Sequence, residues 1–287
     1  MQQHNIGRLT LVGTPIGNLS DFSPRATEAL ATCDFIAAED TRVTLKLLNH
    51  FGIHKPLVSY FEHNKRERGE QICARLLAGE IGVLVTDAGM PAISDPGEDL
   101  VDLCHQKGIP VGVVPGPTAL TTALALAGLP TGRFAFEGFL SVNKRARREH
   151  LDGLRREPRT LVFYEAPHKL PATLADLFAA LGDRRVALVR ELTKIHEEVI
   201  RTTLDQAAQR FATEAPRGEF VLVVEGAPPQ QASAPSPEQA LAIARSYLAQ
   251  GVSPSEAAKQ AAADTGLKKG DIYRLLLADK NQACEGE

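Results

Sequence analysis

Short apolar runs alternate with amphipathic stretches through the first 128 residues. The runs are typical of strands buried in a parallel sheet, and they cover residues 9–12, 35–38, 57–60, 81–85 and 111–114. The stretches between them carry apolar residues at helical spacing. They predict helices over 24–32, from 45 to a stop at Gly52, over 66–77, from 95 onward and from 119 to 127. Strands that alternate with helices predict an α/β domain with a mainly parallel sheet over residues 1–128.

The pattern changes beyond a Gly- and Pro-containing hinge at 128–132. Strands are predicted at 134–136, 160–164, 186–189, 198–201 and 219–224, and helices at 144–155, 171–180 and 204–211. This pattern predicts a second α/β domain, with a mixed sheet, over 129–226. Residues 227–237 have the composition of a linker, and 238–287 predict a small helical unit like a helix-turn-helix.

One predicted helix start has a strong local signature. The sequence Asp95-Pro96-Gly97-Glu98 offers an aspartate cap, a proline at the first helical position and a glutamate that reaches back to the cap. We therefore expect a capping box at this point.

Composition and charge exclude several classes of protein. The chain has 287 residues, of which 44% are hydrophobic and 23% charged, as in ordinary globular proteins. A net charge of −3 disfavours nucleic-acid binding by bulk charge alone. The four cysteines form no CxxC pair, so we expect neither a disulfide framework nor a metal site. The apolar runs are too short to span a membrane and no signal peptide is evident, which predicts a cytoplasmic protein.

Four predicted strands end in loops of unusual composition, and three of these loops contain glycine and proline. The loops are 13–17, 39–42, 86–91 and 115–119. Ligands of open α/β sheets bind beyond the carboxyl ends of strands, where glycine lets backbone approach the ligand. Any one of these loops is more simply interpreted as a tight turn, but four together favour a binding site. The phosphate-binding, nucleophile-elbow and zinc-protease motifs GxGxxG, GxxxxGK[ST], GxSxG and HExxH are all missing from the sequence.

The same loops carry a family resemblance. The segments LVGTPIGNL (11–19), AAEDTR (37–42), TDAGMPAISDPG (86–97), PGPTA (115–119), EGFL (137–140) and FYEAPHKL (163–170) resemble the signature blocks of the tetrapyrrole methylase superfamily. Within it, they are similar to the branch that methylates ribosomal RNA. The resemblance extends from Leu9 to about Gly226.

The resemblance implies a cofactor, a substrate and an assembly. It implies a homodimer that binds S-adenosylmethionine between two α/β domains and methylates a cytidine ribose 2′-hydroxyl in 16S ribosomal RNA. It also implies cofactor contacts from Pro15, Ile16, Asp87, Ala88, Gly89, Met90, Thr118, Ala119, Tyr164 and Glu165. Met90 stands where the family often has threonine.

Methyl transfer to a hydroxyl needs a group that accepts its proton. Glu39 and Asp40 are the first candidates, with Arg42 orienting a phosphate or carboxylate, and His168 and Lys169 are the second. The alternative is that Glu39 or Asp40 caps the next helix and Arg42 pairs with one of them, and that His168 and Lys169 lie in a solvated loop.

A basic segment offers a contact for RNA. Residues 141–160 hold seven basic and three acidic side chains, and the candidates for phosphate contacts are Lys144, Arg145, Arg147 and Arg148. A solvated helix face with ion pairs is an equally good interpretation.

Two rival functions stay open from the sequence. One is methylation of a tetrapyrrole, and the basic segment favours RNA over it. The other is a ligand sensor that binds DNA through the helical unit. Residues 236–287 hold six basic and seven acidic side chains, which weighs against DNA binding.

Overall fold

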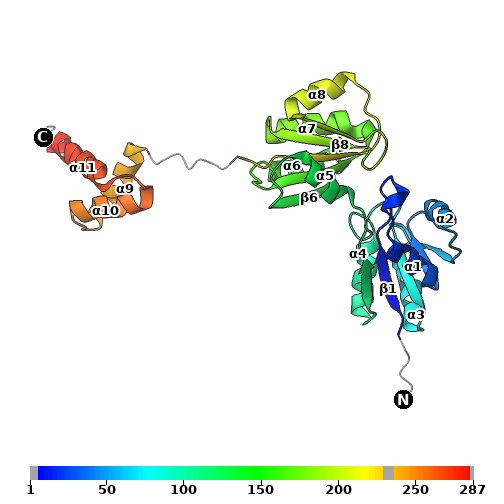
Figure 1. Ribbon diagram of the computed structural model, residues 1–287. Helices are drawn as coiled ribbons and strands as arrows, with labels where there is room; N and C mark the ends of the chain where they lie inside the picture. The colour runs from blue at the N-terminus through cyan, green and yellow to red at the C-terminus, as the bar shows by residue number, and fades with distance from the viewer. Residues whose placement is uncertain (1–5, 229–235, 285–287) are drawn as a thin grey trace, which may run out of the picture. The chain divides into compact units, whose positions relative to one another are not determined.

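The structure is a computed structural model that describes residues 6–228 and 236–284 (Figure 1). The chain forms two compact units, Met1–Ala227 and Pro228–Glu287. The predicted linker, 227–237, lies mostly outside the described residues. The division of the first unit into two domains at residue 128 stays a prediction.

The first sheet is fully parallel, with the strand order β3-β2-β4-β1-β5. Its strands are β1 (Arg8–Val12), β2 (Phe35–Ala38), β3 (Leu57–Ser59), β4 (Ile81–Val85) and β5 (Val111–Val114). Because all five strands run the same way, their carboxyl ends meet at one edge of the sheet. The glycine- and proline-containing loops therefore gather at that edge.

Helices cover both faces of this sheet because both faces of its strands are apolar. Leu9 and Leu11 pack with α3 (Lys65–Leu77) and α4 (Gly97–Gln106), whereas Val12 packs with α1 (Pro24–Thr32) and α2 (Thr41–His50). A short 3₁₀ helix, η1 (Leu19–Asp21), precedes α1.

The second sheet is mixed, as the sequence predicted. Its order is β6-β7-β10-β8-β9, and only β6 and β7 are parallel neighbours. The strands are β6 (Phe134–Phe139), β7 (Thr160–Glu165), β8 (Arg185–Arg190), β9 (Glu198–Thr203) and β10 (Phe220–Val224).

Helices also cover both faces of the second sheet (Figure 1). One face packs against α6 (Lys144–Gly153), α7 (Leu170–Leu181) and α8 (Leu204–Thr213). The other packs against α5 (Ala119–Ala127), through Ala123, Leu124 and Ala127. Helix α5, which follows strand β5 of the first sheet, is thus part of the core of the second sheet.

The second unit is helical, as predicted, and forms a cluster of three helices. It consists of α9 (Pro237–Ala249), α10 (Pro254–Thr265) and α11 (Lys269–Cys284). Its core contains four alanines with Ile272 and Leu276. Small side chains at these positions let the helix backbones approach closely.

The predicted capping box before α4 is wrong. This helix begins at Gly97, its N-terminal flanking residue is Pro96, and no side chain caps it. Asp95 Oδ1 instead accepts hydrogen bonds from the backbone nitrogens of Ala92, at 2.9 Å, and Gly97, at 2.7 Å. The aspartate therefore stabilises the turn that precedes the helix.

Candidate functional site

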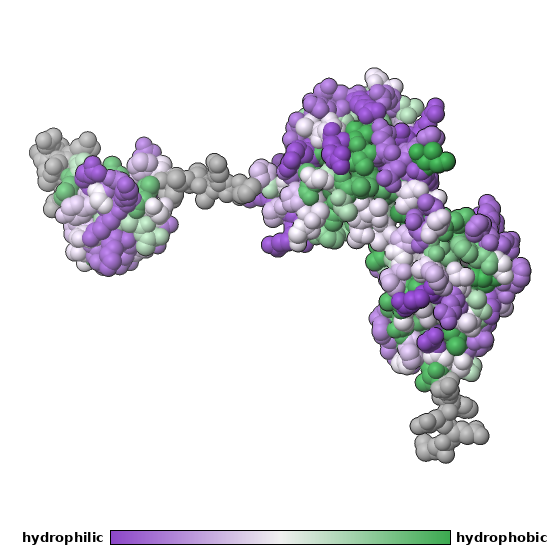
Figure 2. Space-filling view, viewed as in Figure 1, coloured by the Kyte–Doolittle hydropathy of each residue, from purple (hydrophilic) through white to green (hydrophobic). Residues whose placement is uncertain are grey.

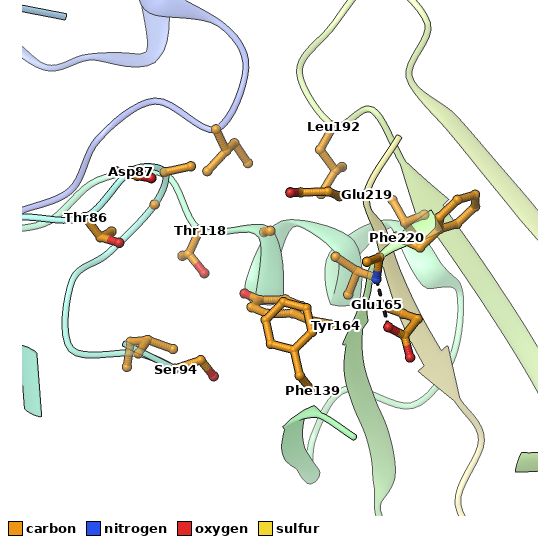
Figure 3. A pocket seen from close by; sticks show the side chains of 18 of the residues that line it. Thr86, Asp87, Ser94, Thr118, Phe139, Tyr164, Glu165, Leu192, Glu219 and Phe220 are labelled. Carbon is orange, nitrogen blue, oxygen red and sulfur yellow. Dashed lines mark hydrogen bonds between the residues drawn. The ribbon is translucent and has the colours of Figure 1, made fainter. Parts of the chain in front are cut away.

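A cavity of about 360 Å³ lies in the first unit, where loops from both sheets meet (Figure 3). The first sheet contributes residues from the loops after β1, β2, β4 and β5, and the second contributes residues from β6, β7, β8 and β10. Nine of the ten predicted cofactor contacts line this cavity: Ile16, Asp87, Ala88, Gly89, Met90, Thr118, Ala119, Tyr164 and Glu165. Pro15 does not line it.

The loops after β1, β4 and β5 are held together by backbone contacts. Thr14 N donates to Gly89 O at 2.8 Å, and Gly89 N donates to Thr14 O at 3.2 Å. A Cβ on Gly13 would lie 2.7 Å from the Cα of Gly116, so this crossing needs glycine at both positions. Met90 also occupies this space, because its sulfur would lie 2.7 Å from a Cβ on Gly13.

Carboxylates line the side of the cavity formed by the first sheet. Glu39 Oε2 accepts a hydrogen bond from Thr86 Oγ1 at 2.8 Å, and Asp87 Oδ1 accepts one from the backbone nitrogen of Asp40 at 3.1 Å. Partial burial raises the pKa of Asp87, and the nearby Glu39 and Asp40 raise it further. The negative charge of Asp87 is therefore less stable than that of an exposed aspartate, and a hydrogen-bond donor on a ligand would stabilise it.

Asp40 and Arg42 form a pair with each other, as in the alternative interpretation of the sequence. Asp40 caps α2 by accepting from the backbone nitrogen of Arg42 at 2.8 Å. The Arg42 guanidinium lies 2.6 Å from the second carboxylate oxygen and lowers the pKa of Asp40 to about 2. Among the described residues, the lining of the cavity includes Glu39 but neither Asp40 nor Arg42.

The second pair of catalytic candidates lies in a 3₁₀ helix, η2 (Pro167–Lys169), directly after β7. His168 is exposed and Lys169 is half-buried. Neither belongs to the part of the cavity wall that residues 6–228 describe. Their catalytic role stays a prediction.

Aromatic side chains form part of the cavity wall on the second sheet. The Tyr164 ring lies 4.9 Å from the ring of Phe136 and 5.5 Å from that of Phe139, measured between centroids. Figure 3 shows Phe139 and Tyr164 side by side at the cavity. Burial raises the pKa of Tyr164, so its hydroxyl stays protonated up to a higher pH than that of an exposed tyrosine.

Glu165 lies at the edge of the cavity but is 3% exposed and already bound. Its carboxylate accepts hydrogen bonds from Thr173 Oγ1 and from the backbone nitrogen of Ala166, the latter at 2.9 Å. Arg147 joins this network from α6, because its Nη2 donates to Thr173 Oγ1 at 3.0 Å and its Nε lies 2.7 Å from Asp176 Oδ2.

Arg147 therefore differs from the other three basic residues predicted to contact RNA. Its side chain is 11% exposed and connects α6 to α7. Lys144, Arg145 and Arg148 are exposed on α6, where Arg145 pairs with Glu149 at 2.8 Å. The structure thus leaves three of the four side chains accessible to a phosphate.

Several residues that line the cavity carried no signal in the sequence. They lie at the end of β8 or directly after it, or at the start of β10 or directly before it, and they are Arg190, Glu191, Leu192, Lys194, Glu219, Phe220 and Val221. The antiparallel pairing of β8 with β10 brings these segments together, and neither segment contains a recognisable motif. Phe139 was part of a signature block, EGFL, but had no predicted role.

No cluster of three or more metal-binding side chains occurs in the described parts of the chain. Cys33, Cys73 and Cys104 are buried and free. The helices that residues 6–228 and 236–284 form include none that is long and apolar enough to cross a bilayer.

Comparison with known proteins agrees with this architecture. Residues 8–208 match the profile of the Tetrapyrrole (Corrin/Porphyrin) Methylases. The ribosomal RNA small subunit methyltransferase I of Synechocystis sp. is 49% identical over 273 residues, which cover 95% of this chain and 98% of that protein. The protein of the same name from Halalkalibacterium halodurans is 46% identical over 280 residues, covering 96% of each chain.

A solved structure shows the same fold. The uroporphyrin-III C-methyltransferase of Thermus thermophilus, crystallised with S-adenosylhomocysteine, superposes with a TM-score of 0.53 at 22% identity. The superposition covers 76% of this chain and 97% of that one. The chain therefore belongs to the tetrapyrrole methylase family and, within it, to the ribosomal RNA small subunit methyltransferase I proteins.

Proposed function

We propose that this chain transfers the methyl group of S-adenosylmethionine to ribosomal RNA of the small subunit, at the 2′-hydroxyl of a cytidine. The observation that carries the proposal is the cavity where loops of both sheets meet, because it contains nine of the ten residues expected to bind the cofactor. The names of the relatives supply the substrate class. The resemblance further implies a homodimer in the cytoplasm, and both belong to this proposal.

The cavity residues fit the cofactor. S-adenosylmethionine carries a positive sulfonium, an α-amino group and an α-carboxylate. Six carboxylates line the cavity against two cationic side chains, Arg190 and Lys194, and four of the six are not engaged by the turn at Asp95 or the network at Glu165. Asp87 would accept hydrogen bonds from the cofactor, and the half-buried Ile16 and Tyr164 would pack against it. When bound, the cofactor supplies a methyl group that its sulfonium already activates. The protein therefore acts mainly by positioning the two reactants.

Glu39 is the best-placed acceptor for the hydroxyl proton. It lines the cavity, and Thr86 holds one carboxylate oxygen by a hydrogen bond while the other stays available. Asp40 is a poor base, because Arg42 lowers its pKa to about 2 and occupies both of its oxygens. We assign proton removal to Glu39.

A transfer assay tests this proposal. Small subunits from a strain that lacks the protein are incubated with purified enzyme and methyl-labelled S-adenosylmethionine, and the RNA is digested to nucleosides. We expect label in 2′-O-methylcytidine. The Glu39→Gln variant should lose about 10²- to 10⁴-fold in kcat, because general base catalysis contributes that much, while its calorimetric affinity for S-adenosylhomocysteine changes less than twofold.

Two results would contradict the proposal. One is the lack of label in RNA with enzyme that binds S-adenosylhomocysteine. The other is label confined to the nucleobases. Full activity of Glu39→Gln would overturn the assignment of the base alone.

A further inference from the structure

An irregularity in β6 turns an aromatic ring into the cavity. Phe136 and Phe139 are three residues apart, so in a regular strand their side chains would point to opposite faces. The register with β7 shifts between Phe136 and Gly138, and Gly138 has a φ of +62°. This bulge places both phenylalanine rings against Tyr164.

A second unusual backbone segment presents an apolar side chain to the same cavity. Ile93 lies between Ala92 and Ser94, whose φ values are +67° and +62°. Such left-handed conformations cost energy for residues other than glycine, and they gather at functional sites. The segment contacts the bulge, since a Cβ on Gly138 would lie 3.3 Å from Ser94 Oγ.

Both side chains are exposed although they are apolar. Phe139 is 58% exposed, the largest value for any aromatic residue that the structure describes, and Ile93 is 47% exposed. Both line the cavity. Single exposed apolar residues are common, but here two separate backbone distortions leave exposed apolar side chains in the lining of the same cavity.

The position of Phe139 in the chain indicates which ligand meets this surface. Four residues separate it from Lys144, the first residue of α6, where Arg145 and Arg148 are also exposed. Proteins hold single-stranded nucleic acid with aromatic faces that stack bases and cationic side chains that neutralise phosphates, and this segment of the chain supplies both kinds of side chain. The small cofactor would be expected deeper in the cavity, where most of its surface is buried.

We propose that Phe139 and Ile93 form a subsite for a nucleobase of the RNA substrate, with the base stacked on the exposed face of Phe139. This proposal rests on the proposed function, because it presumes that RNA is the substrate. It assigns a role in RNA binding to two residues that the catalytic step does not use.

The test compares Phe139→Leu with Phe134→Leu. Phe134 lies on the same strand and is 37% exposed, but it does not line the cavity, so its replacement is a matched control. For Phe139→Leu we expect the KM for small-subunit RNA to rise between about fivefold and a hundredfold, the range that base stacking supplies. The Kd for S-adenosylhomocysteine should stay within twofold of the wild-type value. Phe139→Tyr, which keeps the ring, should restore the KM, and Ile93→Ala should raise it independently.

Each of the other outcomes contradicts either the nucleobase subsite or the proposed function. An unchanged KM for RNA in Phe139→Leu overturns the nucleobase subsite while the proposed function stands. A parallel loss of affinity for S-adenosylhomocysteine also overturns it, because the ring would then belong to the cofactor site. An equal effect of Phe134→Leu shows a general loss of strand structure and likewise contradicts the proposal. Wild-type enzyme that methylates no RNA removes the proposed function itself.

Discussion

Asp87 is the cavity residue whose ionisation most directly connects structure to cofactor binding. Its pKa is raised above the usual value of 3.8 by burial and by the neighbouring carboxylates. As pH falls, Asp87 is therefore protonated earlier than an ordinary aspartate, and it then loses its charge and part of its capacity to accept hydrogen bonds.

We expect the affinity for S-adenosylhomocysteine to fall as pH is lowered from 8 through the raised pKa of Asp87. In Asp87→Asn the affinity should be lower at pH 8 and should depend less on pH, because the titrating group is gone. Isothermal titration calorimetry across this range measures both effects. The same steep pH dependence in the variant would show that another group is responsible.

At the scale of single residues, the sequence predicted which residues line the cofactor cavity better than it predicted the pairing of the candidate catalytic side chains. Ile16, Asp87 and Thr118 follow strands of a parallel sheet, so the topology alone brings them to one edge. The state of Asp40 depends on whether its carboxylate pairs with Arg42, which a sequence leaves open. The position of Phe139 depends on a bulge that the alternation of residues does not reveal.

At the scale of elements, the crossing of the loops after β1 and β5 depends on two glycines. Gly116→Ala would place a Cβ 2.8 Å from the Cα of Gly13, and the backbones would have to separate. Overpacking of this kind costs about 1–3 kcal/mol. We expect a thermal unfolding midpoint a few degrees lower and weaker binding of S-adenosylhomocysteine.

Gly112→Ala is the matched control for this change. Gly112 lies on β5 itself, and a Cβ added there meets nothing within 4 Å. Differential scanning fluorimetry and calorimetry on both variants check the prediction. Equal effects of the two substitutions would mean that strand β5, and not the crossing, is sensitive to alanine.

Most elements were predictable because each depends on local pattern. Helix α1 and strands β2, β4 and β5 have the bounds that the sequence indicated. The predicted start of α4 was wrong, because Asp95 accepts a hydrogen bond from Ala92 in the preceding turn and does not cap the helix. The segments after β8 and before β10 carry no motif, and only antiparallel pairing brings them to the cavity.

At the scale of the whole molecule, the chain combines a cofactor cavity, a basic helix and a separate helical unit. The cavity and α6 both belong to Met1–Ala227, so binding of cofactor and RNA is assigned to this unit. The three helices of Pro228–Glu287 form their own core and carry no assigned role.

The proposed function requires that this protein methylates a ribose of small-subunit RNA in the cell. The most direct measurement is mass mapping of 16S ribosomal RNA from a strain that lacks the protein, complemented with wild-type protein or with Glu39→Gln. We predict that one 2′-O-methylcytidine is lost, that the wild type restores it and that Glu39→Gln does not. Ribosomal RNA that keeps all its methyl groups without the protein would contradict the account.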